Sequence, residues 1–196
     1  NSKKILIYGV NGFIGKNLII ELIKANYDVY AISSSNKIDI TNNDTKYFKR
    51  CKFIKINRLK KIDIHFALLN SSPNNKKTKN DSFLKSINEY KKILSNLNKN
   101  VVLVYLSSGI VCFKNDLDRG NSFYRSYKKK MEKIVIQNAI KNENTYKIMR
   151  IFSIYGPYMP LQKYAIGLLI SSINEKKPLS FHSDGDFFRD YIFVKD

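Results

Sequence analysis

The stretch Gly9-Val10-Asn11-Gly12-Phe13-Ile14-Gly15 follows the apolar run Lys4 to Tyr8 and opens a helical pattern from Phe13 to about Ala25. Glycines in a turn between a strand and a helix permit positive φ angles and let the backbone approach a ligand closely. The N–H groups and the dipole at the helix start favour an anion such as a pyrophosphate. In this context the G-x-x-G-x-x-G spacing predicts a dinucleotide site, with coenzyme contacts at Gly9, Gly12, Phe13, Ile14 and Gly15.

The composition fits one globular core. The chain has 196 residues, of which 43% are hydrophobic, and this is enough for a single Rossmann-sized unit. We expect a dinucleotide-binding domain over residues 1–160 and the start of a substrate-binding region over 161–196. No apolar run reaches the roughly 18 to 20 residues of a membrane span, and the basic start lacks a signal-peptide cleavage region. We therefore interpret the chain as soluble and cytoplasmic.

The charge and the metal-binding residue types exclude some functions. The formal net charge is +19, which would ordinarily suggest a nucleic-acid partner, but the lysines are dispersed along the whole chain. We therefore do not expect nucleic-acid binding, although a basic field would help to collect an anionic nucleotide substrate. Cys51, Cys112, His65 and His182 lack the spacing of metal ligands, and we expect no metal site.

Apolar runs alternate with amphipathic segments along the chain. Strands are expected at Ile5–Tyr8, Val29–Ile32, Phe53–Ile56, Ile64–Leu69, Val101–Leu106 and Ile148–Phe152. Long helices are expected at Asp81–Leu97, from an Asp/Ser cap, and at Ser122–Asn142, with a shorter one at Gln162–Glu175. This alternation predicts an α/β fold of the Rossmann type, a doubly wound parallel sheet with helices on both faces. Ligands of such a sheet bind at the carboxyl ends of its strands.

Two segments carry groups suited to proton transfer. The strand Val101–Leu106 delivers Ser107 and Ser108 to its carboxyl end. Tyr124 and Lys128 stand at positions i and i+4 of a predicted helix, so that they face the same site. A lysine cation beside a tyrosine hydroxyl lowers the pKa of that hydroxyl and suits it to acid/base work near neutral pH. Tyr191 and Lys195 have the same spacing but belong to a predicted strand, where the two groups could not cooperate.

From Lys4 to Asp196 the chain resembles the extended short-chain dehydrogenase/reductase family, which includes nucleotide-sugar epimerases, dehydratases and 4-ketoreductases. The landmarks are the glycine turn, Leu106-Ser107-Ser108, Tyr124 with Lys128 and Glu132, Arg150 to Pro157, and Asp184-Gly185 leading into Arg189 to Asp196. Their order along the chain matches the order of these motifs in the family.

The resemblance implies residue roles. Aligning Val111 with the valine of the family's S-x-x-V-Y-G pattern makes Ser108 the catalytic serine, with Tyr124 as acid/base and Lys128 holding the nicotinamide ribose. Cys112 and Phe113 replace the usual Tyr-Gly, which indicates a modified substrate pocket. The other implied contacts are Leu69 and Tyr155 for the coenzyme, with Tyr155 near the nicotinamide, and Ser153 and Arg189 for the substrate, with Arg189 gripping its pyrophosphate.

The end of the second predicted strand bears on coenzyme choice. NAD-preferring sites usually carry Asp or Glu there, whereas this chain has Ser33. Ser33, Ser34, Ser35 and Lys37 could bind a 2′-phosphate, so the chain permits NADP, and the choice between NAD and NADP stays open. Asp39 resembles the family's adenine-contacting aspartate, which does not discriminate the two coenzymes.

The resemblance implies an NAD(P)-dependent nucleotide-sugar epimerase or 4-ketoreductase, between which the sequence does not decide. Family dehydratases carry an Asp-Glu pair after the catalytic Ser/Thr, where this chain has Gly109 and Ile110, so dehydration is disfavoured. The alternative is a non-catalytic NAD(P)-binding sensor or regulatory protein. The implied partners are a nucleotide sugar and a second copy that pairs through the helix bearing Tyr124. Because the carboxyl-terminal substrate region would be largely absent or very small, the chain is either shortened or a short member of the family.

Overall fold

The structure is a computed structural model that describes residues 2–33, 44–70, 79–113, 122–178 and 190–196. It contains two compact units, Asn1–Ile151 and Phe152–Asp196. The predicted domains 1–160 and 161–196 refer to coenzyme and substrate binding, and they stay a prediction.

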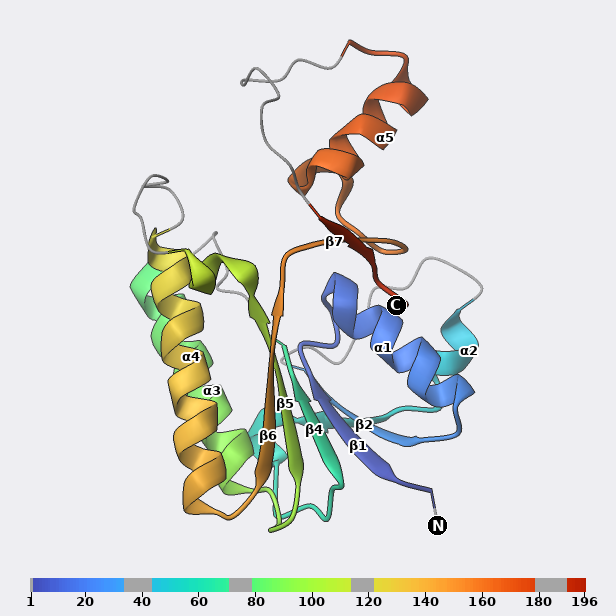
Figure 1. Ribbon diagram of the computed structural model, residues 1–196. Helices are drawn as coiled ribbons and strands as arrows, with labels where there is room; N and C mark the ends of the chain where they lie inside the picture. Colours follow the sequence, from blue (N-terminus) through green and yellow to red (C-terminus); the bar gives the residue numbers. More distant parts are fainter. Residues whose placement is uncertain (1, 34–43, 71–78, 114–121, 179–189) are drawn as a thin grey trace. The chain divides into compact units, whose positions relative to one another are not determined.

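A six-stranded parallel sheet forms the first unit (Figure 1). The strand order is β3-β2-β1-β4-β5-β6, so the direction of winding reverses beside β1. This is the order of the dinucleotide-binding Rossmann fold, and the predicted fold class is confirmed. The strands are β1 (Lys4–Tyr8), β2 (Asp28–Ser33), β3 (Lys52–Lys55), β4 (Phe66–Leu69), β5 (Val102–Ser108) and β6 (Thr145–Ile151).

Helices cover both faces of this sheet. Figure 1 shows α1 and α2 on one face and α3 and α4 on the other. Their bounds are α1 (Phe13–Lys24), α2 (Thr45–Phe48), α3 (Lys79–Ser95) and α4 (Ser122–Lys141), with short 3₁₀ turns η1 (Ile56–Arg58) and η2 (Gly109–Cys112). On β5, Leu103 and Tyr105 are completely buried, whereas the alternate residues Val102 and Val104 are only half-buried. The main core therefore includes one face of β5 together with buried residues of α3 and α4.

Several boundaries differ from those expected. Helix α3 begins at Lys79, so Asp81 lies inside the helix and is not its cap. Strand β6 begins at Thr145, three residues before the expected start, because its polar first residues pair with β5 from Val102 onward. This pairing continues to Ser108, which extends β5 two residues beyond the expected end. The short α2 was not predicted.

The second unit contains a two-stranded parallel sheet and one helix. Strand β7 (Ser153–Tyr155) pairs with β8 (Tyr191–Phe193), and the rings of Tyr155 and Phe193 lie 5.4 Å apart. The predicted helix over 162–175 is divided into a 3₁₀ turn, η3 (Leu161–Lys163), and helix α5 (Ala165–Glu175).

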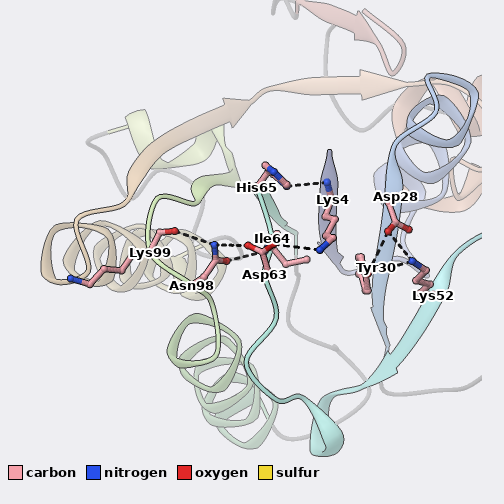
Figure 2. A network of polar contacts seen from close by, with 9 residues as sticks. All are labelled: Lys4, Asp28, Tyr30, Lys52, Asp63, Ile64, His65, Asn98 and Lys99. Carbon is pink, nitrogen blue, oxygen red and sulfur yellow. Dashed lines mark hydrogen bonds and ion pairs between the residues drawn. The ribbon is translucent and has the colours of Figure 1, made fainter. Parts of the chain in front are cut away.

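Polar side chains tie together the amino ends of the strands, at the opposite edge of the sheet from their carboxyl ends (Figure 2). Asn98, which precedes β5, accepts a hydrogen bond from the Ile64 N–H at 2.9 Å and donates one to Asp63 at 3.1 Å. Asp63 also pairs with the ammonium of Lys4, the first residue of β1, at 3.4 Å. Asn98 thus links the segments that enter β4 and β5 directly, and through Asp63 it is also linked to the start of β1.

We expect the substitution Asn98→Ala to lower the free energy of unfolding by about 1–3 kcal/mol, because it leaves the N–H of buried Ile64 without its partner. For a chain of this size each kcal/mol corresponds to a loss of about 2–4 °C in Tm. Thermal unfolding followed by circular dichroism measures the change. The control Asn88→Ala removes an exposed asparagine of α3 and should leave Tm unchanged. Equal Tm values for the two variants would contradict the proposed link.

Candidate active site

The glycine turn between β1 and α1 passes directly against the end of β4. Gly9 has φ +89°, and a Cβ atom built on it would lie 1.9 Å from the backbone oxygen of Asn70. A Cβ atom on Gly15 would lie 2.3 Å from the oxygen of Gly9. The packing of the chain therefore requires glycine at positions 9 and 15, whether or not a ligand binds.

Gly12 is less constrained, because a Cβ atom there would crowd its own chain only slightly. Its φ is −79°, which any residue adopts, and a built Cβ would lie 3.3 Å from the oxygen of Gly9 and 3.9 Å from the side-chain nitrogen of Asn70. Gly12 is the N-cap of α1, and it provides no side-chain cap. The first turn of α1 carries no acidic residue. The helix start thus has the features of an anion site, and bare backbone at Gly12 allows close approach.

Three further predicted coenzyme residues border this turn. Phe13 is buried and Ile14 is half-buried in the first turn of α1, so their backbone N–H groups are the parts directed to the helix start. Leu69, the last residue of β4, is completely buried and pairs with Tyr8 of β1. Its side chain belongs to the core, so only its backbone could meet a ligand.

The two serines at the end of β5 have different hydrogen bonds. Ser107 is buried, and its hydroxyl donates to Oε1 of Glu132 at 2.5 Å. Ser108 is half-buried and is the N-cap of η2, where its oxygen accepts a hydrogen bond from the Ile110 N–H at 3.4 Å. The proton of Ser107 is therefore committed, whereas this bond leaves the proton of Ser108 available for another acceptor.

Helix α4 brings Tyr124 and Lys128 together as expected. The Lys128 ammonium donates to the backbone oxygen of Leu106 at 2.9 Å. It lies 5.7 Å from the ring centroid of Tyr124 and 5.1 Å from that of Tyr105, distances that allow cation–π attraction. The residue is only 2% exposed. Burial lowers the pKa of Lys128 to about 8, against the opposing effect of Glu132.

The other predicted site residues lie at the carboxyl end of β2, in the second unit or outside the described residues. Ser33 ends β2, where its backbone is paired with Lys55. Ser153 and Tyr155 are the first and last residues of β7. The residues outside the described part of the chain are Ser34, Ser35, Lys37, Asp39 and Arg189.

A charge pair without a role in the sequence prediction lies beside these serines: Glu132 is buried, whereas the Arg150 side chain is 46% exposed. Nε and Nη2 of Arg150 donate to the two carboxylate oxygens of Glu132, at 3.1 Å and 2.8 Å. Burial of Glu132 raises its pKa, but the hydrogen bonds from Arg150 and Ser107 outweigh burial and hold the pKa below its usual value. The available signal was an acidic residue on the apolar face of a helix, between Met131 and Val135.

The described residues contain no group of three or more side chains that could together hold a metal ion. None of their helices has the length and apolar character that crossing a bilayer requires.

Known proteins share this architecture. Residues 5–196 match the model of a family described as the NAD dependent epimerase/dehydratase family. UDP-glucuronic acid 4-epimerase from Bacillus cereus, in complex with NAD, is 23% identical with a TM-score of 0.71, over 98% of this chain and 69% of that chain. A comparison with curated protein sequences finds no match.

Two further solved structures are similar at lower identity. The dTDP-glucose 4,6-dehydratase from Bacillus anthracis, in complex with NAD, is 20% identical with a TM-score of 0.71, over 99% of this chain and 68% of that chain. ADP-L-glycero-D-manno-heptose-6-epimerase from Helicobacter pylori is 17% identical with a TM-score of 0.73, over 99% of this chain and 70% of that chain. At these identities the likeness shows a common fold.

The positions of Gly15 and Gly12 predict different losses of stability when each is replaced by alanine. We expect Gly15→Ala to destabilise the chain by about 2 kcal/mol or more, because the new methyl group would overlap the backbone of Gly9. Gly12→Ala should cost less than about 1 kcal/mol, since its methyl group needs only a small displacement. Urea unfolding of both variants measures the difference. Similar losses at the two positions would contradict the distinction between them.

Proposed function

Because the chain belongs to the NAD-dependent epimerase/dehydratase family, as its resemblance to extended short-chain dehydrogenases/reductases implied, we propose that it binds NAD or NADP and acts on a nucleotide sugar. The proposed reaction is epimerisation or 4-keto reduction at a sugar carbon. The observation that supports it most is the placement of Lys128 and Tyr124 on one helix beside the end of β5, together with the glycine turn.

In this proposal the start of α1 binds the coenzyme pyrophosphate. The N–H groups of its first turn and the helix dipole attract the anion, and the missing side chain at Gly12 lets it approach. The carboxyl end of β2 at Ser33 bears no carboxylate, so both NAD and a 2′-phosphorylated coenzyme are compatible. Ser34, Ser35, Lys37 and Asp39 remain proposed contacts of the adenosine half.

Ser108, Tyr124 and Lys128 are the proposed catalytic residues. When bound, the nicotinamide coenzyme supplies a hydride acceptor or donor. The Tyr124 oxygen takes the proton of a sugar hydroxyl as its carbon is oxidised and returns a proton when the ketone is reduced. The Ser108 hydroxyl donates a hydrogen bond to the same sugar oxygen. The positive charge of Lys128 stabilises the tyrosinate, and its side chain also holds the nicotinamide ribose.

The residues after Ser108 favour these reactions over dehydration. Loss of water from a sugar requires an additional acid and base near the reacting carbons. Gly109 is buried at the start of η2, and neither it nor Ile110 has a group that moves a proton. An epimerase keeps its coenzyme through the cycle, whereas a ketoreductase exchanges it at every turnover.

The remaining parts of the proposal concern the second unit, the oligomer and the location of the protein. Tyr155 is the proposed neighbour of the nicotinamide, and Ser153 and Arg189 are the proposed substrate contacts. A homodimer through α4, the helix that bears Tyr124, and a cytoplasmic location complete the proposal.

Coenzyme binding can be tested without a known sugar. We expect NAD or NADP to bind the wild-type chain and Gly12→Asp to weaken binding by about 100-fold or more, because it places a negative charge at the pyrophosphate site. Asp is a favourable N-cap residue, so Tm should not fall. Isothermal calorimetry with both coenzymes measures binding. The absence of binding to the wild type would contradict the proposal, whereas binding without turnover would favour the sensor alternative.

Turnover is tested with a panel of UDP-, dTDP- and ADP-sugars, followed by NMR of the products with each coenzyme present. We expect Tyr124→Phe to lower kcat by about 10²–10⁴-fold, because it removes the acid/base hydroxyl. The control Tyr127→Phe changes a buried tyrosine on the same helix, whose ring lies 5.4 Å from that of Phe83 of α3, and should retain most activity. Equal losses in the two variants would exclude a specific role for Tyr124.

A further inference from the structure

A carboxylate lies buried one helical turn from Lys128. Glu132 is 6% exposed and stands at position i+4 from Lys128, which is itself at i+4 from Tyr124. These three residues therefore follow one another along the same side of α4. Acidic side chains are almost never buried unless they are paired. The proposed catalytic steps involve Tyr124 and Lys128 and leave Glu132 without a role.

Side chains from two strands hold this carboxylate of α4 in position. Ser107 of β5 donates to Oε1, and Arg150 of β6 donates to both oxygens in a forked arrangement. Ser107 and Arg150 are themselves opposite each other in the pairing of β5 with β6. The two donors therefore hold Glu132 at the junction of both strands with α4. They also keep it ionised, since their hydrogen bonds lower its pKa despite burial.

The buried ammonium of Lys128 has contacts with β5 and with its own helix. From β5 it meets the Leu106 carbonyl oxygen and the ring of Tyr105, and from α4 the ring of Tyr124. These groups are neutral dipoles or aromatic faces. Arg150 of β6 is a second cation, but it is bound to Glu132. Among the described residues, Glu132 supplies the negative charge that counteracts the effect of burial on the pKa of Lys128.

We propose that Glu132 is a positioning residue of the site: its carboxylate, clamped by Ser107 and Arg150, is the counter-charge that keeps Lys128 in its ammonium form beside Tyr124. This inference rests on the proposed function, because it assigns Glu132 a role through the proposed catalytic lysine. Glu132 itself contacts neither substrate nor coenzyme in this scheme. Its effect is to maintain the cation that stabilises the tyrosinate of Tyr124.

The direct test is the titration of Lys128 by ¹³C NMR of the chain labelled at lysine Cε. The signal is assigned by its absence from the Lys128→Arg variant. In Glu132→Gln we expect the pKa of Lys128 to fall from about 8 to about 7 or lower. Because lysine is charged below its pKa, the ammonium is then lost at lower pH, and its fraction at pH 8 falls about fivefold. An unchanged titration of Lys128 in Glu132→Gln overturns the proposal.

The matched control is Glu89→Gln. Glu89 of α3 is also a partly buried carboxylate, which accepts a hydrogen bond from Tyr8 and pairs with Lys85 at 3.9 Å. Its substitution removes a comparable charge at a place that does not adjoin Lys128. We expect it to leave the titration of Lys128 unchanged. If Glu89→Gln lowers the pKa as much as Glu132→Gln does, the specific role of Glu132 is overturned.

Turnover gives a second readout. Glu132→Gln should lower kcat more at pH 8 than at pH 6, because the neutral lysine predominates at the higher pH, and Glu132→Asp, which keeps the charge, should retain the wild-type pH profile. A uniform loss at both pH values would indicate a merely structural role and would overturn the proposal. The NMR titration needs neither coenzyme nor turnover. A wild type without coenzyme binding or activity would therefore count against the proposed function alone.

A stability measurement covers the case in which Glu132→Gln does not fold. The double variant Lys128→Met/Glu132→Gln removes both charges, so it should have a higher Tm than Glu132→Gln, because the buried ammonium is removed together with its proposed counter-charge. If the double variant is no more stable than the single one, Glu132 does not serve as the counter-charge of Lys128.

Discussion

The close contact of the β1–α1 turn with the end of β4 is the constraint on which the rest of the site depends. Only a backbone without side chains fits there, since a Cβ on Gly9 would lie 1.9 Å from Asn70 and one on Gly15 would lie 2.3 Å from Gly9. β1 is also the strand beside which the order reverses, so α1 and α3 lie on opposite faces. The turn therefore lies at the switch point, where doubly wound sheets bind their ligands. Among these three glycines, Gly12 is the one whose replacement the packing of the turn opposes least.

The electrostatic cost in the first unit comes from one buried lysine and not from the high net charge of the chain. The net charge of +19 arises largely from lysines, and exposed lysines cost little because water and salt screen them. Lys128 is 2% exposed, and burying its ammonium is expensive unless other groups replace water. A carbonyl oxygen, two aromatic faces and a carboxylate one turn away do so.

Tyr105 is a core residue whose ring lies against the buried ammonium of Lys128. Its side chain is completely buried, and its hydroxyl has no hydrogen-bond partner among the described residues. A buried hydroxyl without a partner is destabilising, and a phenylalanine would avoid that cost. Its ring faces the ammonium of Lys128 at 5.1 Å and contacts Tyr90 edge to face at 6.0 Å. The ring, and not the hydroxyl, thus accounts for the contribution of Tyr105 in this structure.

The sequence predicted the sheet, its main helices and the pairing of Tyr124 with Lys128, because each depends on local periodicity. It did not predict the early start of β6 at Thr145, since a polar edge strand forms only through its pairing with β5. Nor did it predict the role of Ser107, whose hydroxyl meets Glu132 from a residue 25 positions away. The family pattern implied Ser108 without this information, and the hydrogen bond of Ser107 to Glu132 is consistent with that proposal, because it uses the Ser107 proton.

The residues of the proposed site are divided between the two units. The glycine turn, Ser108, Tyr124 and Lys128 all lie in the first unit, so this unit supplies the proposed pyrophosphate site and the proton transfer. The second unit contributes the proposed substrate contacts Ser153 and Arg189, and also Tyr155, the proposed neighbour of the nicotinamide. Because the pyrophosphate site and the substrate contacts belong to different units, a loss of coenzyme binding and a loss of substrate selectivity should be separable by mutation. In particular, failure to turn over one sugar nucleotide does not contradict the coenzyme site, whereas failure to bind either coenzyme contradicts the entire catalytic assignment.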